Sequence, residues 1–482
     1  MGVEHIVLGL VRGDGPALSI FKALGLDINA VQKRLESSGR RARQPRSGAE
    51  LAYTSHAKHL IEVASREARQ SGTALSAEHL LLAAVQQPRG TVARILADAQ
   101  ISPDRARATI QRAIQGESAS PSGKEKRGGR VRISWRLILL LAVPLSVVLQ
   151  LVLHAPALPV FIVACLGVLP LAGYMGEATE HLAHRAGPMI GGLLNATFGN
   201  AAELIISIVA LRAGLVALVK ASITGSILGN LLLILGVALV SGGIRRTELK
   251  FNRTSAGMSA GMLALAVVAL VLPALFHVLH PEQSARLSEL RMSEAVAVIL
   301  LLTYGLSLLF TLRTHRCLFW SESHPLAGPP WSPRKATLIL ALATAGVAVQ
   351  SEILVHAAGQ ATRTVGLTET FLGLIIIPII GNAAEHATAV LVARKGKIDL
   401  ALQIALGSST QVALLVAPLL VFIGVALGRE MNLVFTTFEV MALSLATLVT
   451  AIITLDGESH WFEGVQLLAV YGMVAVGAFF LV

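Results

Sequence analysis

GNAAE occurs twice, at residues 199–203 and at residues 381–385, and each copy lies inside a long apolar run. A carboxylate is costly to place in hydrocarbon, so an acid in such a run marks a functional site in a membrane protein. Each glutamate, Glu203 or Glu385, follows an asparagine by three positions. On a helix those two positions are neighbours on one face. We therefore predict that Asn200, Asn382 and the two acids bring oxygen ligands to one site.

The repetition extends beyond the pentapeptide. Residue 385 follows residue 203 by 182 positions, and the Gly-Ser pair at 407–408 follows the pair at 225–226 by the same 182, which indicates one duplication. Carboxylate, amide and hydroxyl oxygens suit Ca²⁺, Mg²⁺, Na⁺ or protons rather than soft metals. The alternative is that the small and polar residues hold helices together. Downstream of the acids, the further oxygen donors are Ser226, Asn230, Ser408, Ser409 and Gln411.

Composition restricts the class of protein. The 482 residues are 54% hydrophobic and 14% charged, which predicts a polytopic membrane protein. Residues 1–134 hold 21 Lys and Arg against 12 Asp and Glu, so most of the net charge of +11 lies there. A cytoplasmic region facing anionic lipid explains this charge better than a nucleic-acid partner. Two cysteines exclude a disulfide framework, and without a phosphate loop, nucleophile elbow or HExxH motif we expect no enzyme and no resident cofactor.

Residues 1–116 read as short amphipathic helices with a repeat of their own, because EHIVL at 4–8 matches EHLLL at 78–82. A helix over about residues 54–71 precedes the second copy only, so we expect an incomplete first repeat or a start further upstream. The lone histidine in each copy, His5 or His79, favours packing or a capping role over metal binding. Residues 117–134 are rich in Ser, Gly, Lys and Arg, which predicts a flexible linker.

The first 116 residues resemble the Clp N-terminal repeat domain. The resemblance rests on GVEHIVLGLVRGDGPALSIFKALGLD at 2–27 and LAYTSHAKHLIEVASREARQSGTALSAEHLLLAAV at 51–85. It implies an α-helical docking or regulatory module, and no GxxxxGK[ST] loop of an attached ATPase follows. One hypothesis of a different class is therefore a membrane scaffold that recruits a Clp-type chaperone or protease.

From residue 135 onward the chain is almost entirely apolar, and we predict eleven transmembrane helices. Basic residues fall on alternate connections, which predicts a cytoplasmic N-terminal domain and a C-terminus outside. After an extra helix at 135–155, two groups of five helices remain, at 156–313 and 334–482, joined by a cytoplasmic loop at 314–333. Because five is odd, the second group enters the membrane in the opposite sense. The predicted spans are 135–153, 157–176, 188–211, 217–241, 256–279, 293–312, 334–357, 367–392, 399–427, 432–455 and 463–482.

Residues 135–482 resemble the Ca²⁺/H⁺ antiporters of the cation/Ca²⁺ exchanger superfamily. The matching stretches are GGLLNATFGNAAELIISIVAL at 191–211, ASITGSILGNLLLILG at 221–236 and IIGNAAEHATAVLVARKGKIDLALQIALGSSTQVALLVAPLLV at 379–421, with DGESHWFEG at 456–464 as the closing loop. The resemblance implies an all-α fold of two inverted five-helix repeats in a bacterial inner membrane. It implies Ca²⁺ and protons as transported substrates and lipid as the surroundings. Homo-oligomers and a protein partner for the N-terminal domain are compatible with it.

The same resemblance assigns roles to residues. Glu203 and Glu385 would bind Ca²⁺ and exchange it for protons, because two nearby carboxylates in a low-dielectric site cannot both stay ionised without a cation. Ser408-Ser409 stands where Na⁺/Ca²⁺ exchangers carry an aspartate, which favours H⁺ over Na⁺ coupling. The alternative within the same fold is a Na⁺- or K⁺-coupled exchanger of Ca²⁺ or another divalent cation. The supporting ligands would be Asn200, Asn382, Ser226, Ser408 and Gln411, and the relay or gate candidates beside them are His386, Asn230 and Ser409. Glu352 is a further relay candidate because it is an acid inside an apolar run, with helix packing as the alternative. Glu439, near the start of a span, is expected to reach the membrane interface.

Overall fold

The computed structural model describes residues 3–12, 20–21, 23–24, 26–28, 30–33, 54–70, 76–86, 91–99, 101–114, 135–280, 286–315, 331–366 and 368–480. The predicted linker at 117–134 and most of the predicted loop at 314–333 lie outside these residues. The chain divides into two compact units, Met1–Arg130 and Val131–Val482, which are described separately.

The N-terminal unit is a small helical domain. Its described helices are α1 (Val3–Arg12), α4 (Ser55–Gln70), α5 (Ala77–Val85), α6 (Thr91–Asp98) and α7 (Pro103–Ile114). Helices α1 and α5 begin at equivalent positions of the two copies of the repeated sequence. Leu60, Leu81 and Ile110 are fully buried in one core. The helical prediction for this region is therefore confirmed in the residues described.

His79 takes part in the capping box at the start of α5. Ser76 precedes the helix in an extended conformation, and its side chain and backbone both contact the His79 ring, with 2.7 Å between Ser76 Oγ and His79 Nδ1. This reciprocal contact satisfies backbone groups that a helix start leaves unpaired. The capping role was one of the two interpretations that the sequence favoured.

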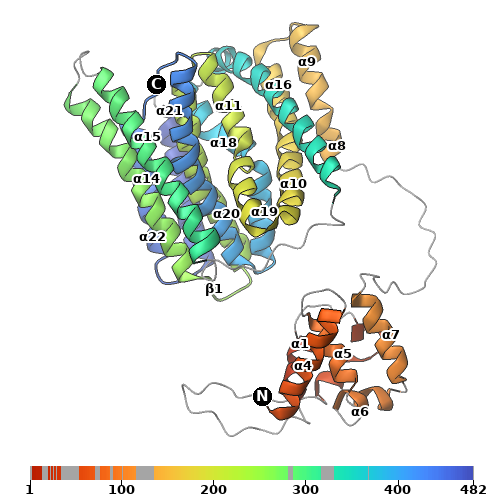
Figure 1. Cartoon of the computed structure of the whole chain (residues 1–482). Helices are drawn as coiled ribbons and strands as arrows, with labels where there is room; N and C mark the ends of the chain where they lie inside the picture. The colour runs from red at the N-terminus through yellow and green to blue at the C-terminus, as the bar shows by residue number, and fades with distance from the viewer. Residues whose placement is uncertain are drawn as a thin grey trace. The chain divides into compact units, whose positions relative to one another are not determined.

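The second unit is a bundle of long apolar helices (Figure 1). In it, α14 and α15 lie at one side, and α8, α9, α10 and α16 lie at the other. The elements are α8 (Trp135–Leu140), α9 (Ala142–Leu151), α10 (Ala157–Phe198), α11 (Ala201–Arg212), α12 (Val216–Leu228), η1 (Gly229–Ile234), α13 (Leu235–Gly243), β1 (Leu249–Lys250), α14 (Arg253–Leu279), α15 (Arg286–Leu309), η3 (Phe310–Thr314), α16 (Pro333–Val365), α17 (Glu369–Phe371), η5 (Leu372–Ile376), α18 (Ile377–Gly381), α19 (Ala383–Arg394), α20 (Ile398–Gln411), η6 (Val412–Val416), α21 (Ala417–Ala426), α22 (Thr437–Ile453), β2 (Glu458–Ser459) and α23 (Trp461–Phe480).

By length and composition, seven helices in the described residues can cross a membrane, or eight if the bent pair Glu369–Gly381 and Ala383–Arg394 is one span. The predicted count of eleven is therefore not confirmed. Three predicted spans are built from shorter pieces: α8 with α9, the end of α10 with α11, and α22. An integral membrane protein nevertheless follows, because each long span contains an 18-residue window of high hydropathy.

Helix α10 bends sharply within its 42 residues. A Cβ added to Gly191 would lie 2.6 Å from the carbonyl oxygen of Ala183, eight positions earlier. Eight residues of a straight helix would separate these levels by about 12 Å. The chain therefore changes direction between the two predicted spans that α10 contains.

The duplication read from the sequence recurs in the secondary structure. Helices α11 and α19 cover equivalent positions of the two copies, 201–212 and 383–394. Each half then has an α-helix that passes into a π-helical turn, α12 into η1 and α20 into η6. π-Helical turns inside longer helices are frequent at functional sites. Equivalent backbone irregularities thus follow the two acids.

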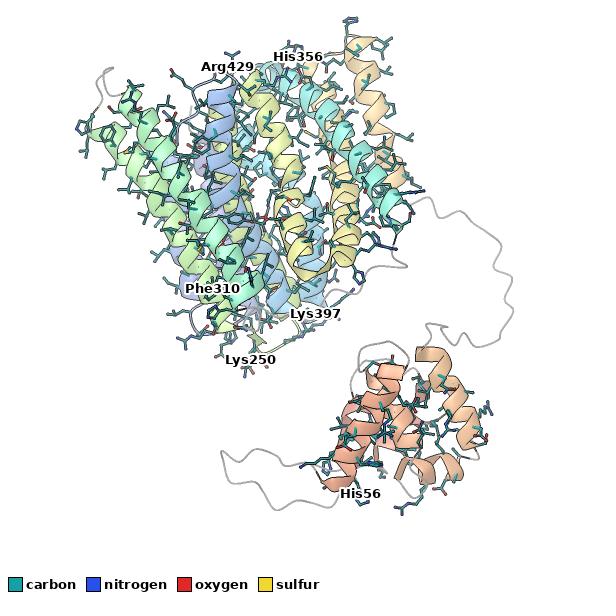
Figure 2. All side chains as sticks on the ribbon, in the orientation of Figure 1. His56, Lys250, Phe310, His356, Lys397 and Arg429 are labelled. Atoms are coloured by element: carbon teal, nitrogen blue, oxygen red, sulfur yellow. The ribbon has the colours of Figure 1, made fainter. Side chains whose placement is uncertain are left out.

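Basic residues lie at both ends of the bundle. Lys250 and Lys397 lie at one end, and Arg429 and His356 lie at the other (Figure 2). Strands β1 and β2 pair antiparallel, Leu249 with Ser459 and Lys250 with Glu458, which joins the two halves at the Lys250 end. Arg429 donates to the carbonyl oxygen of Arg212, so α12 begins at the opposite end.

The extra N-terminal helix docks through a buried amide. Pro144 lacks a backbone N–H to donate, and the helix is interrupted at Leu141 between α8 and α9. Ser146 on α9 donates to Gln350 Oε1 at 2.9 Å, and Gln350 donates back to the Val143 carbonyl oxygen at 3.3 Å. Both Ser146 and Gln350 are fully buried, so α9 is held against α16.

Candidate cation-binding site

Each GNAAE copy forms a break between two helices. Asn200 separates α10 from α11, and Asn382 separates α18 from α19, with the second pair bent by 61°. Glu203 and Glu385 consequently lie in the first turns of α11 and α19. A helix N-terminus carries a partial positive charge, so it favours a carboxylate there. The pattern of Asn followed three residues later by Glu therefore places both acids at helix starts inside the bundle.

The two copies cross each other. A Cβ added to Gly199 would lie 3.5 Å from Oε1 of Glu385, and one added to Gly381 would lie 3.5 Å from Cγ of Glu203. Each acid thus lies against the glycine of the other copy, and the two carboxylates interact electrostatically. Glu203 is 5% exposed, whereas Glu385 is half-buried. The predicted convergence of the two segments is what the structure has.

Asn200 is held by the second half. Its Oδ1 accepts from the Ser408 hydroxyl at 3.1 Å, and its Nδ2 donates to Gln411 Oε1 at 2.6 Å. The Ser408 side chain also contacts the Glu385 carboxylate. Both polar groups of the Asn200 amide are therefore engaged by α20.

Asn382 is held by the first half, but only through its nitrogen. Its Nδ2 donates to Ser226 Oγ at 3.3 Å. In the part of the chain that the structure describes, three buried oxygens at this crossing have no hydrogen-bond partner: Asn382 Oδ1, Glu203 Oε2 and Glu385 Oε2. Buried polar atoms are normally satisfied. A hard cation or protons would satisfy these three acceptor oxygens, which lack hydrogen-bond donors.

The relay candidates separate into two groups. His386 Nε2 lies 3.1 Å from Asn230 Oδ1, and both residues are buried beside the crossing. The Ser409 hydroxyl is bonded to backbone carbonyl oxygens, including that of Ala405 at 2.9 Å. Glu352 on α16 has an exposed side chain, and none of the hydrogen bonds described at the crossing involves it. The structure thus brings His386 and Asn230 to the site and leaves Glu352 outside it.

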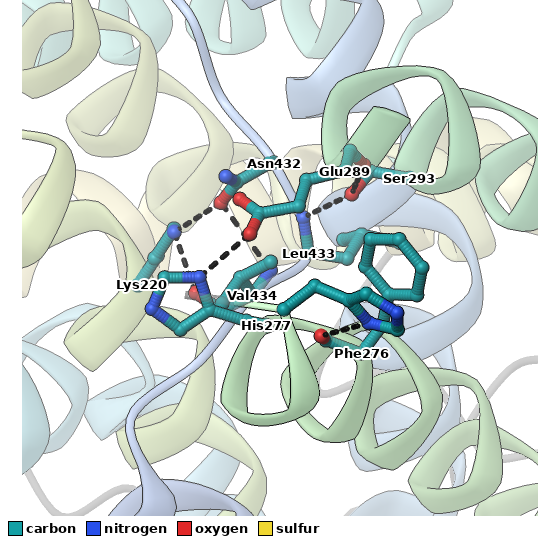
Figure 3. Close-up of polar contacts among 9 residues, drawn as sticks. Lys220, Phe276, His277, Glu289, Ser293, Asn432, Leu433 and Val434 are labelled. Carbon is teal, nitrogen blue, oxygen red and sulfur yellow. Dashed lines mark hydrogen bonds and ion pairs between the residues drawn. The ribbon is translucent and has the colours of Figure 1, made fainter. Parts of the chain in front are cut away.

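A buried ionic cluster was missed by the sequence analysis. Lys220 on α12 donates to Asn432 Oδ1 and to the Val434 carbonyl oxygen, and Glu289 contacts His277 nearby (Figure 3). The signal was present, because Lys220 is a single lysine inside a long apolar run. Among the described residues, no group of three or more His, Cys, Asp or Glu side chains is arranged to hold a metal.

The expectation for Glu439 was wrong. Its side chain is 2% exposed, so it does not extend out of the bundle as snorkelling requires. Glu439 Oε2 accepts from the Thr436 backbone N–H at 2.9 Å and from the Thr436 hydroxyl at 2.8 Å, while the Glu439 N–H donates to Thr436 Oγ1. This capping box starts α22. The sequence Thr-x-x-Glu at 436–439 is the pattern of such a capping box. In the structure Glu439 caps the helix rather than extending out of the bundle.

The membrane domain of this chain matches a known protein family. The model of the sodium/calcium exchanger protein family matches residues 156–313 and 335–480, more than half of the chain. The chain belongs to the sodium/calcium exchanger family. A Ca²⁺/H⁺ antiporter of Aphanothece halophytica is 45% identical over 358 residues, covering 71% of this chain and 95% of that protein. The Ca²⁺/H⁺ antiporter ChaA of Bacillus subtilis is 45% identical over 344 residues, covering 70% and 97%.

Other members of the exchanger family have solved structures. Native YfkE is similar to this chain with a TM-score of 0.63 and 42% sequence identity, over 72% of this chain and all of YfkE. The family model of the Clp repeat N-terminal domain matches residues 1–76. The chain therefore joins an exchanger-family membrane domain to a Clp-type helical domain, as the two resemblances predicted.

Proposed function

We propose that this chain is a secondary transporter that exchanges Ca²⁺ for H⁺ across a membrane. The observation that carries the proposal is the crossing of the two GNAAE copies, where three buried acceptor oxygens have no partner among the described residues. Its relatives at 45% identity include two named Ca²⁺/H⁺ antiporters. An ion-coupled transporter of this kind is not an enzyme, and Ca²⁺ and H⁺ are its substrates.

Glu203, Glu385 and Asn382 are the proposed direct ligands of Ca²⁺. Asn200, Ser226, Ser408 and Gln411 would hold these ligands in place, because their polar atoms are bonded to one another across the two halves. Oxygen-only coordination by carboxylates and an amide matches the preference of Ca²⁺. His386 with Asn230 would hold a proton beside Glu385.

The transport of Ca²⁺ would be coupled to that of protons because both bind to the same two glutamates. Two interacting carboxylates in a dry site cannot both remain ionised without a cation, so either one Ca²⁺ or protons occupy them. A site that holds one or the other, and that opens to one side at a time, exchanges them. The gradient of protons would then drive Ca²⁺ in the opposite direction.

Alternating access would come from two inverted five-helix repeats. The recurrence of α11 as α19 and of α12 with η1 as α20 with η6 supports two copies of one unit. In transporters of this kind the site lies near the midplane between the repeats. We assign the end with Lys250 and Lys397 to the cytoplasm, because basic loops favour that side.

The test is Ca²⁺ uptake into everted membrane vesicles under an imposed pH gradient. We expect uptake by the intact chain and its loss in Glu203→Gln and in Glu385→Gln, because a neutral amide keeps the shape but removes the exchangeable charge. Lys250→Met, at an exposed position, is the matched control and should retain uptake. Uptake driven by Na⁺ or K⁺ instead of the pH gradient would contradict the proposal.

A further inference from the structure

Lys220 is a charged group in the membrane domain that the proposed site does not use. It lies on α12 six residues before Ser226, and its ammonium donates to Asn432 Oδ1 and, at 2.6 Å, to the Val434 carbonyl oxygen (Figure 3). It also interacts electrostatically with Glu439 and Glu289. A lysine inside a hydrocarbon layer needs such partners, since an unpaired charge there is costly. Lys220 therefore joins α12 to the segment between α21 and α22.

The partners of Lys220 are themselves fixed. Glu439 and Glu289 are 2% and 6% exposed, and Glu289 contacts His277 Nδ1 at 2.7 Å. Ser293, one turn after Glu289, accepts from the Leu433 N–H at 3.0 Å. Residues 432–439 of the second half are thus held by α12 and α15 of the first half. The lysine contact is one part of a rigid connection between the halves.

The lysine of this connection occurs in one of the two sequence copies. In the second copy, the position on α20 that is equivalent to Lys220 is occupied by Leu402. A leucine carries no charge, so it cannot reproduce the ammonium contacts of Lys220. The duplicated unit has therefore acquired the lysine in one copy, at the end where α12 begins.

Helix α12 connects Lys220 to the candidate site. Six helical residues give about 9 Å between the levels of Lys220 and Ser226. Directly after α12, the π-helical turn η1 carries Asn230, which contacts His386. A π-helical turn departs from the regular helix register, so η1 does not rigidly fix the rotation of α12 from the far side. The contacts of Lys220 fix α12 at the near end, in addition to the close packing of α12 against η5 at Gly225.

We propose that Lys220 is a positioning residue for cation binding: by tying the start of α12 to Asn432 and Val434, it sets the place of Ser226 against Asn382. This inference rests on the proposed exchange function. Lys220 touches no substrate in the proposal, and it acts only through the helix that carries Ser226 and Asn230. When the Lys220 contacts are lost, α12 can shift, and the Ser226 hydroxyl moves away from the Asn382 amide.

The experiment compares Lys220→Met, Lys220→Arg and the control Lys250→Met in vesicles, with flux normalised to folded transporter. For Lys220→Met we expect the Ca²⁺ concentration at half-maximal rate to rise about tenfold, with a much smaller change in maximal rate, the size of one lost hydrogen bond to a charged group. Lys220→Arg restores most of the affinity. Lys250, which pairs with Glu248 at the surface, should have no effect. A purely structural role would lower the amount of folded protein and leave the half-maximal concentration unchanged.

A second variant covers the case in which Lys220→Met does not fold, because it leaves Glu439 buried without its cation. Lys220→Met with Glu439→Gln removes one charge of each sign and keeps an acceptor for the Thr436 cap. We expect this double variant to fold and still to bind Ca²⁺ more weakly, as measured by calorimetry of the purified transporter. A folded double variant with the affinity of the intact chain overturns the inference. Failure of the intact chain to bind Ca²⁺ at all would instead overturn the proposed function.

Discussion

Asn382 Nδ2 donates a hydrogen bond to the Ser226 hydroxyl, 156 residues earlier in the chain. The equivalent Asn200 instead accepts a hydrogen bond from the equivalent serine, Ser408, through its side-chain oxygen. The same pair of residue types therefore leaves the oxygen of Asn382 without a partner and the oxygen of Asn200 occupied. The two halves of the candidate site share the Asn, Glu and Gly-Ser positions but differ in what they offer to a cation.

This difference predicts unequal effects of the two asparagines. Asn382→Ala removes a proposed ligand oxygen, so we expect Ca²⁺ to bind about tenfold more weakly or worse. Asn200→Ala removes a residue that holds Ser408 and Gln411, so we expect a smaller loss. Calorimetric titration of the purified variants with Ca²⁺ measures both. Equal losses would show that the amide oxygen of Asn382 is not a ligand.

The glycines of the two Gly-Ser pairs predict a second inequality. A Cβ added to Gly225 would overlap the Leu374 carbonyl oxygen, because α12 and η5 cross closely there. The equivalent Gly407 has no atom within 4 Å of such a Cβ. We expect Gly225→Ala to lower stability by about 1–3 kcal/mol and to impair exchange, since overpacking must displace a backbone. Gly407→Ala is the control, and its thermal stability and exchange should match those of the intact chain.

The site was largely predictable because duplication is visible in the sequence. A single offset links Glu203 to Glu385 and Ser226 to Ser408, and segments related in this way meet in the structure. Which amide oxygen stays unbonded was not predictable. The pairing depends on amide and hydroxyl orientations at the crossing and on Gln411, whose equivalent in the first copy is Gly229.

The parts that were missed depend on contacts between distant segments. Lys220 is fixed by Asn432 and Val434, whose residue types give no sign of a charged partner. The number of spans was also uncertain for a physical reason. Hydropathy cannot distinguish a helix that bends, as α10 does near Gly191, from two separate spans.

Glu352 is an acid in an apolar run that does not lie at the crossing of the two GNAAE copies. It was a relay candidate, yet its side chain is exposed on α16. An exposed side chain outside the crossing cannot exchange its charge with the buried carboxylates by direct contact. We expect Glu352→Gln to retain exchange to within about twofold, in contrast to Glu203→Gln. Loss of pH-driven Ca²⁺ uptake in the Glu352 variant would restore it as a relay.

The N-terminal unit has its own core, so exchange should not need it. Leu60, Leu81 and Ile110 pack within residues 1–130, and the membrane domain forms a separate compact unit from Val131. We expect a chain that starts at Val131 to retain Ca²⁺ uptake per folded transporter. The intact chain in the same vesicles is the control. A loss of uptake with normal folding would make the Clp-type domain part of the transport machinery rather than a docking module.

The pH dependence of Ca²⁺ binding tests the sharing of the two acids. If Ca²⁺ binds only when Glu203 and Glu385 are ionised, each proton bound to the free site must leave as Ca²⁺ enters. Affinity then rises with pH, by up to about tenfold per pH unit for each proton released, and levels off where the free site is already ionised. Titrations with Ca²⁺ in buffers of different ionisation enthalpy count the protons directly. With Glu203→Gln at most one carboxylate remains, so the slope should fall by about one proton. A Ca²⁺ affinity that is independent of pH in the intact chain would mean that cation and protons do not compete for these carboxylates.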